Sequence, residues 1–239
     1  MKTEILFCAL LMLAAQASSQ RRELESDIKA IANAATEVIP DNPDETTFVK
    51  IVLMLQNIID YDPKSQIFEI TAWLLVEWTD NRFAWKPADY GNITKISIPS
   101  SGVTKPDIKL YNSVKSGMIV DDDVNCVISY SGTVTYIPIT NMKVYCPNTD
   151  PSDDTYVCSL KFGSWAHNCH DLNITRFDDM IDMSEYQGGW RWQILEQSSE
   201  VHEKQYDCCP ETYCDATMKL KFRDRSKTPR GRWSYSYCH

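Results

Sequence analysis

The chain lacks any hydrophobic run long enough to cross a bilayer. Its one long apolar run, Ile5–Ala15, follows the charged start Met1-Lys2 and leads into the small-residue stretch 15–19. This arrangement is typical of a cleaved secretory signal peptide, and the run is too short for a membrane helix. We therefore expect residues 1–19 to be a signal peptide. Residues 20–239 should then form one secreted, extracellular domain without membrane insertion.

Positive charge is also scarce, since 24 Lys and Arg are outnumbered by 33 Asp and Glu, giving a net charge of −9. An acidic surface disfavours nucleic acid as a partner and mildly favours cations. No nucleophile elbow, phosphate-binding loop or metalloprotease motif is present. We expect no enzyme activity, no cofactor and no metal. Zinc at His167, Cys169 and His170 and calcium at residues 121–123 are the alternatives to a disulfide and a solvated turn.

Nine cysteines stand in the chain, and one of them, Cys8, lies in the expected signal peptide. The even number that remains indicates disulfides in an exported protein. Cys146 and Cys158 enclose a polar, turn-rich segment, which indicates a short disulfide-closed loop between two strands. The adjacent pair Cys208-Cys209 either forms a strained ring with itself or bonds to two distant partners.

Two sequons, at Asn92 and Asn173, are candidate glycosylation sites on surface loops. No internal repeat, low-complexity segment or linker divides the chain.

Helical periodicity is confined to the start of the mature chain, where Leu24, Ile28 and Ile31 predict a helix from Arg21 to about Thr36. After Pro40 and Pro43 the pattern changes to short strands about every ten residues, which predicts an all-β sandwich of about ten strands behind an N-terminal α-helix.

Three strands alternate clearly between apolar and mixed positions. In residues 66–78 the even positions from Phe68 to Trp78 are all apolar and should face the core, so that Trp73 faces outward. In a second strand, 125–139, we expect one face to carry Ile128, Tyr130, Val134 and Tyr136, and the other to carry Val127, Thr133, Thr135 and Ile137. A third strand, 216–224, has a solvated outer face that carries lysine and arginine.

Several motifs in this order resemble the extracellular ligand-binding domain of the Cys-loop, nicotinic-type pentameric receptors, and most of all the acetylcholine-binding proteins. The resemblance extends over nearly the whole mature chain. It rests on Trp73-Leu74, Trp78-Thr79-Asp80, Trp85, Pro106-Asp107, Leu110-Tyr111-Asn112, the Cys146–Cys158 loop, Lys161-Phe162-Gly163-Ser164-Trp165 and the stretch from Tyr206 to Tyr213.

The resemblance implies an immunoglobulin-like sandwich that assembles as a homopentamer and binds acetylcholine or a related cation between neighbouring subunits. Aromatic rings attract such a cation through their faces. The principal face of the site would consist of Tyr111, Trp165, Tyr206 and Tyr213, with the disulfide Cys208–Cys209 at the tip of a closing loop. The complementary face would consist of Trp73, Val127, Thr135 and Ile137.

Some features depart from the receptor pattern. The Cys146–Cys158 loop is short and polar and lacks the Phe-Pro-Phe centre of receptors, and His239 stands where a receptor's first membrane helix would begin. Both favour a free secreted protein over the extracellular domain of a ligand-gated channel. The aliphatic Val127 and Ile137 leave a non-cationic ligand open, and a secreted hydrolase or lectin is a further alternative. Four additional cysteines can pair in three ways. These cysteines are Cys126, Cys169, Cys214 and Cys238.

Overall fold

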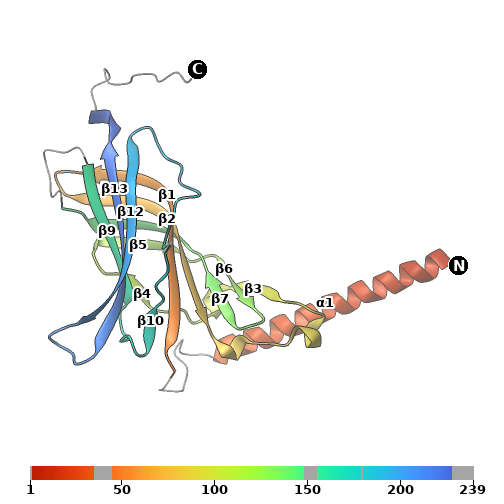
Figure 1. Cartoon of the computed structure of the whole chain (residues 1–239). Coiled ribbons are helices and arrows are strands. Elements are labelled where there is room, and N and C mark those ends of the chain that lie inside the picture. Colours follow the sequence, from red (N-terminus) through yellow and green to blue (C-terminus); the bar gives the residue numbers. More distant parts are fainter. Residues whose placement is uncertain (1, 35–44, 148–154, 179, 228–239) are drawn as a thin grey trace, which may run out of the picture.

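The computed structural model describes residues 2–34, 45–147, 155–178 and 180–227. Two β-sheets pack face to face, and one N-terminal helix, α1 (Lys2–Ala34), lies at one end of them and projects away (Figure 1). Together they hold thirteen strands in the described part of the chain, against about ten expected, because several two- or three-residue strands add to the long ones. The predicted all-β sandwich with an N-terminal helix is confirmed.

The larger sheet has nine strands, and its main path runs β10-β1-β2-β7-β6-β3. Its strands are β1 (Thr47–Asp62), β2 (Ile67–Thr79), β3 (Lys95–Pro99), β5 (Ser113–Asp121), β6 (Asn125–Ser129), β7 (Thr133–Tyr136), β8 (Ile139–Tyr145), β10 (Leu172–Ile174) and β11 (Ile181–Asp182). The smaller sheet has the order β12-β13-β9-β4. Its strands are β4 (Ile108–Leu110), β9 (Thr155–Ser164), β12 (Trp192–Gln205) and β13 (Thr212–Asp224).

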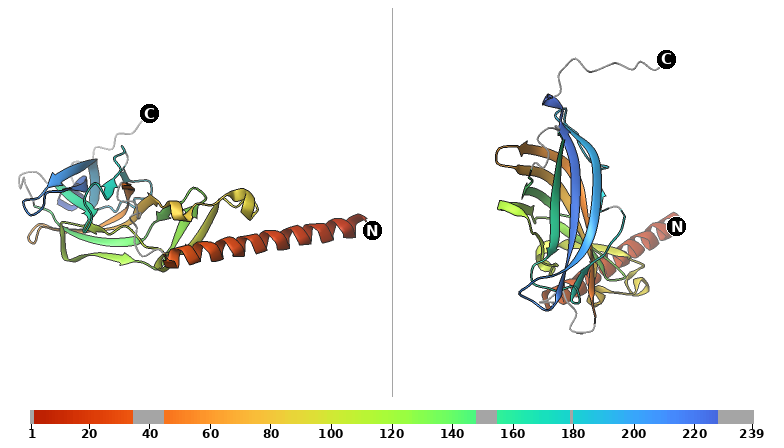
Figure 2. Two further views of the ribbon diagram at one scale, coloured as in Figure 1. Left: turned by 90° about the horizontal axis from the view of Figure 1, so that it is seen from below. Right: turned by 60° about the vertical axis from the view of Figure 1, so that its left-hand side comes forward.

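Aromatic side chains fill the space between the two sheets. Phe68 of β2 stacks on Phe222 of β13 with ring centroids 4.8 Å apart, and Tyr61 of β1 lies 4.4 Å from Tyr156 of β9. The Cys146–Cys158 disulfide joins the end of β8 to β9 and so connects the two sheets covalently. Figure 2 shows the two layers from other directions. The segment that this disulfide encloses lies partly outside the described residues, at 148–154.

The predicted alternation is confirmed in β2, where every even position from Phe68 to Trp78 is buried and every odd position from Ile67 to Glu77 is partly exposed. It is confirmed again in β13, where Met218, Leu220 and Phe222 are buried. A strand between a core and solvent needs this period of two, because successive side chains point to opposite faces.

The prediction of a single strand over residues 125–139 is wrong. This segment contains two antiparallel strands, β6 and β7, joined by a turn in which the Gly132 amide donates to the Ser129 carbonyl, and β8 begins only at Ile139. Gly132 has φ +83°, a conformation that glycine adopts without strain. Ile128, Val134 and Tyr136 are buried as expected, whereas Tyr130 lies in the turn and is exposed.

Helix α1 begins earlier than the periodicity predicted, at Lys2 rather than Arg21, because no glycine or proline interrupts residues 2–34. Leu24 and Ile28 are buried against the sandwich, whereas Phe7 and Leu11 in the expected signal peptide are exposed. The predicted end near Thr36 and the two prolines after it lie outside the described residues. No helix within the described ranges is both long and apolar enough to span a bilayer.

The two sequons differ in their surroundings. Asn92 is exposed and follows Gly91 in a turn. Asn173 is part of β10, where it is half-buried and opposite Phe48 of β1, so the expected loop position is wrong for this sequon.

Candidate functional site

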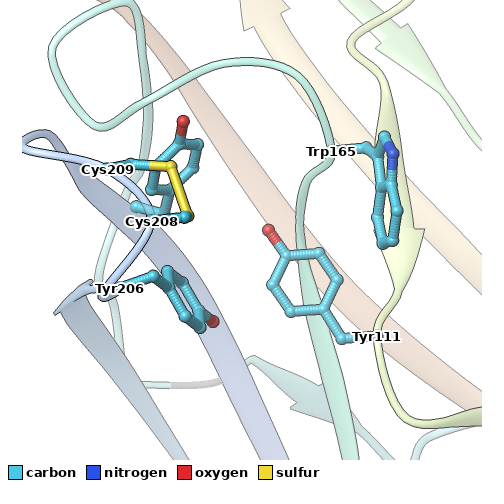
Figure 3. Close-up of a pocket in the computed structure, with 6 residues that line it drawn as sticks. Tyr111, Trp165, Tyr206, Cys208 and Cys209 are labelled. Carbon is cyan, nitrogen blue, oxygen red and sulfur yellow. A yellow bond between two sulfur atoms is a disulfide. The ribbon is translucent and has the colours of Figure 1, made fainter.

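One cavity of about 510 Å³ opens beside the smaller sheet, and all the residues predicted for the principal face line it (Figure 3). Tyr111 directly follows β4, Trp165 directly follows β9, and Tyr206 directly follows β12. The remaining lining residues belong to the β12–β13 hairpin: they are Cys208, Cys209 and Tyr213. Since the four aromatic side chains lie where strands of one sheet end or begin, the sheet itself sets the spacing of the rings.

The aromatic rings meet edge to face. The centroids of Tyr111 and Trp165 are 6.2 Å apart at an interplanar angle of 74°, and those of Tyr206 and Tyr213 are 6.0 Å apart at 68°. In Figure 3 the vicinal disulfide and Tyr206 lie on one side of the cavity and Trp165 on the other. Trp165 is 72% exposed, so its ring is available for a further contact. None of the lining side chains carries a charge.

Trp165 is held in place through its backbone by Asp107, a residue that the sequence analysis did not assign a role. The Asp107 carboxylate accepts hydrogen bonds from the backbone amides of Trp165 (3.1 Å) and Ala166 (2.8 Å). Its other oxygen accepts a hydrogen bond from the hydroxyl of Ser164, which in turn accepts one from the His167 amide. A carboxylate with several donors is a strong anchor. Asp107 therefore fixes the turn that presents the exposed indole.

Tyr111 is fixed at both ends. Its backbone amide donates to the Lys161 carbonyl at 2.7 Å, and its hydroxyl donates to the Ser164 carbonyl. The next residue, Asn112, accepts a hydrogen bond from the Lys161 amide through its side chain and donates to the Ser159 carbonyl. Burial, with smaller contributions from Tyr206 and Asp215, raises the pKa of Tyr111 to about 12. The phenol is therefore neutral at physiological pH.

Charged side chains lie next to the aromatic rings of the cavity. The carboxylate of Asp215, only 2% exposed, forms an ion pair with Lys161 at 2.9 Å and contacts His202 Nδ1 at 3.3 Å. The ammonium of Lys161 also lies 5.8 Å from the Tyr111 ring centroid. Lys204 holds its ammonium 4.8 Å from the centroid of Tyr206. Two rings of the site, those of Tyr111 and Tyr206, thus each have a lysine ammonium near them.

The closing loop is a tight turn between β12 and β13. The Cys209 amide donates to the Tyr206 carbonyl at 3.0 Å, and the Gln205 side chain donates to the Pro210 carbonyl at 2.9 Å. Cys208 and Cys209 are bonded to each other, so of the two alternatives left open for them the vicinal disulfide is correct.

A third disulfide, Cys169–Cys214, selects one of the three pairings that the sequence left open. With this bond made, Cys169 is not a zinc ligand. Cys126 is buried and forms no disulfide within the described ranges, and Cys238 lies outside them. Among the described residues no group of three His, Cys, Asp or Glu side chains is arranged to hold a metal ion. In the expected turn at 121–123, Asp122 contacts Lys105 and the Tyr136 hydroxyl.

The residues predicted for the complementary face do not line this cavity. Trp73, Val127 and Thr135 lie in the larger sheet, and Ile137 directly follows β7. Val127 and Thr135 are opposite each other in the ladder, and the Thr135 hydroxyl donates to the Glu77 carboxylate at 3.0 Å. Val127 and Ile137 are exposed. The residues predicted for the principal face and those predicted for the complementary face therefore lie on two separate surfaces of one chain.

Comparisons with known proteins confirm the resemblance that the motifs carry. The family model of the neurotransmitter-gated ion-channel ligand binding domain matches residues 29–226. The acetylcholine receptor subunit alpha-type acr-16 of Caenorhabditis briggsae is 35% identical over 93% of this chain and 44% of its own length. The neuronal acetylcholine receptor subunit alpha-2 of Mus musculus is 32% identical over 91% of this chain and 44% of its own length. The chain thus spans less than half the length of these relatives.

Proposed function

This chain belongs to the family of neurotransmitter-gated ion-channel ligand-binding domains, and we propose that it binds acetylcholine or a related cationic ligand reversibly outside the cell. The family is one of ligand-binding, non-enzymatic domains, which removes the hydrolase alternative. The observation that carries the proposal is the uncharged cavity walled by Tyr111, Trp165, Tyr206 and Tyr213. A cation desolvated against such ring faces gains about 2 kcal/mol or more.

The proposed ligand site is completed by a second copy of the chain. Trp73, Val127, Thr135 and Ile137 of one subunit would cover the open side of the aromatic cavity of its neighbour. A head-to-tail contact between two different surfaces closes into a ring when the rotation permits, and we propose a ring of five. Exposed aliphatic side chains on the larger sheet support this, since such patches on a monomer favour association.

A matched pair of ligands tests the cationic proposal. Choline and its neutral tert-butyl analogue, 3,3-dimethylbutanol, have similar apolar area and differ mainly in charge. Trp165 lies at the cavity and should report binding through its fluorescence. We expect choline to bind about thirtyfold more tightly, which corresponds to about 2 kcal/mol. Equal affinity would contradict the cationic proposal and favour the non-cationic ligand suggested by Val127 and Ile137.

Light scattering tests the ring. Ile139 lies opposite Trp73 in the sheet and is exposed, so Ile139→Lys should reduce the mass of the assembly toward that of one chain. Val157 of β9 is similarly exposed on the smaller sheet, and Val157→Lys should leave the mass unchanged. A wild-type protein that remains monomeric at micromolar concentration would contradict the ring.

Secretion and glycosylation complete the proposal. The apolar side chains of Phe7, Leu11 and Met12 are exposed, which suits a segment that is removed. Protein expressed in eukaryotic cells should appear in the medium without residues 1–19 and lose mass on glycosidase treatment, with Asn92 the better acceptor of the two sequons because Asn173 lies in a strand. Intact Met1 on intracellular protein would contradict export.

A second function is favoured by the length of the relatives. They are receptor subunits more than twice as long as the matched region, and on this ground we propose, as the second candidate, that the chain is the ligand-binding part of a ligand-gated channel. Sequencing the complete transcript separates the two, because a channel subunit continues into membrane helices after residue 239.

A further inference from the structure

The β12–β13 hairpin leaves the body of the smaller sheet before it reaches the cavity. The pairing of β13 with β9 begins at Asp215, opposite Gly163, whereas residues 212–214 pair only with β12. On the other strand, β12 is the edge of the sheet and is mostly exposed from Leu195 to Gln205. The end of the hairpin, residues 203–214, thus has no sheet neighbour beyond its own two strands, and it extends past the sandwich in Figure 1.

The Cys169–Cys214 disulfide lies at the point where the hairpin leaves the sheet. Cys214 is the first buried residue of β13, and Thr212 and Tyr213 before it are exposed or partly exposed. The bond joins it to Cys169, a residue 45 positions earlier in the chain, with the two Cα atoms 5.1 Å apart. A hydrogen bond of 2.8 Å from the Cys169 amide to the Thr212 carbonyl lies beside the disulfide.

The segment on the other side of this cross-link is rigidly held. Asn168 accepts hydrogen bonds from the amides of His170 and Asp171 through its side chain, and its own carbonyl accepts one from the Leu172 amide. Leu172 then enters β10, which pairs with β1 of the larger sheet. The same segment begins at the Trp165 turn that Asp107 holds. The disulfide therefore connects the base of the hairpin to the support of Trp165.

We propose that the Cys169–Cys214 disulfide is a positioning element of the ligand site, which anchors the hairpin at its base and confines its movement to residues 205–213. Tyr213 adjoins the anchored Cys214, so its ring keeps its place in the cavity wall, while the tip with the vicinal disulfide remains free to move. A site whose walls are held in the bound arrangement loses less conformational freedom on binding. Only the effect of this disulfide on ligand binding rests on the proposed function; the anchoring of the hairpin does not.

Hydrogen exchange in the absence of ligand tests the anchor itself. In the double variant Cys169→Ser/Cys214→Ser, the backbone amide at position 169 and the hydrogen-bonded amides within 205–213 should exchange at least tenfold faster, at a temperature where the core amides of β1 and β2 are unchanged. The matched control Cys208→Ser/Cys209→Ser removes the disulfide at the tip and should leave the amide at position 169 protected. Should the serine pair fail to fold, Cys169→Ala/Cys214→Ala avoids burying a hydroxyl at these sites.

Binding kinetics test the effect on the ligand. Stopped-flow fluorescence with acetylcholine should show a dissociation rate about tenfold higher in the double variant, with little change in the association rate. Unchanged exchange at 169 and 205–213 would overturn the anchor, and faster exchange with an unchanged dissociation rate would overturn its positioning role. If the wild type binds no cation while the exchange result holds, the proposed function fails and the anchor stands.

Discussion

Gly163 offers a sharp test of how the aromatic cavity is built, because this residue lies directly beneath the ring of Tyr111. A Cβ atom added to Gly163 would lie 2.5 Å from Cζ of Tyr111 and 2.9 Å from the carbonyl oxygen of Cys214. Cys214 pairs with β12 and is held by its disulfide to Cys169, and the pairing of β13 with β9 begins at the next residue, so this carbonyl cannot move cheaply. In Gly163→Ala the Tyr111 ring must therefore shift.

The expected magnitude follows from overpacking. An added methyl group in a well-packed site costs about 1–3 kcal/mol of stability. A displaced Tyr111 ring would also lose its hydroxyl's bond to the Ser164 carbonyl and its edge-to-face contact with Trp165. We expect the free energy of unfolding to fall by about 1–3 kcal/mol. Affinity for choline should fall by about tenfold or more, which corresponds to about 1.4 kcal/mol.

Urea unfolding and fluorescence titration measure the two effects, and the chain supplies a matched control. A Cβ on Gly102 would meet nothing within 4 Å, so Gly102→Ala should change neither quantity. A double-mutant cycle isolates the cause, because in a Tyr111→Ala background the ring is gone and Gly163→Ala should cost less. The same stability cost in both backgrounds, or wild-type binding by Gly163→Ala, would refute this account of the site.

Four further substitutions separate ligand binding, core packing, the support of Trp165 and the titration of Tyr111. Trp165→Ala should abolish choline binding in a fluorescence or calorimetric titration with a stability change below about 0.5 kcal/mol, since the indole is 72% exposed. Trp78→Ala, which truncates a side chain only 2% exposed, should cost about 3–5 kcal/mol in urea unfolding. Asp107→Asn should weaken choline binding and cost about 1–3 kcal/mol, because the amide group cannot accept all the hydrogen bonds of the carboxylate. The pKa of Tyr111 is raised from 10.0 to about 12 in the folded protein, so the unfolded chain releases this proton first as the pH rises. The contribution of Tyr111 to stability is therefore complete below pH 10 and lost by about pH 12. Tyr111→Phe should remove this fall in the urea midpoint between pH 10 and pH 12.

The face of the sheet on which each strand residue lies could be predicted from the sequence, because burial of the apolar face alone decides it. In β2 the two faces differ strongly in composition, and the predicted outward position of Trp73 agrees with its partial exposure. The same reasoning failed at Tyr130, because alternation of apolar residues continued across a turn whose only local signal was Ser131-Gly132. Periodicity reports which face a residue occupies, and it does not report where a strand ends.

The supports of the site could not be predicted from local patterns. Asp107 and Trp165 are far apart in the sequence, and they meet only because β4 pairs with the end of β9, with Ile108 opposite Ser164. The Cys169–Cys214 bond has the same origin, since 45 residues separate the two cysteines. The aromatic residues themselves were recognised through ordered motifs along the chain. The groups that hold them in place come from tertiary pairing and carry no motif of their own.

The acidic residues near the cavity explain why aromatic rings, rather than carboxylates, are offered to a ligand. Asp215 is neutralised by Lys161, and Asp107 is occupied by backbone amides and the Ser164 hydroxyl. Neither carboxylate lines the cavity. A buried carboxylate facing the ligand would pair strongly with any cation and would be costly to leave unpaired when the ligand departs. Ring faces attract a cation without that penalty. Asp107 thus serves to fix the turn of Trp165, and under the proposed function the rings alone would meet a cation, which could then also leave.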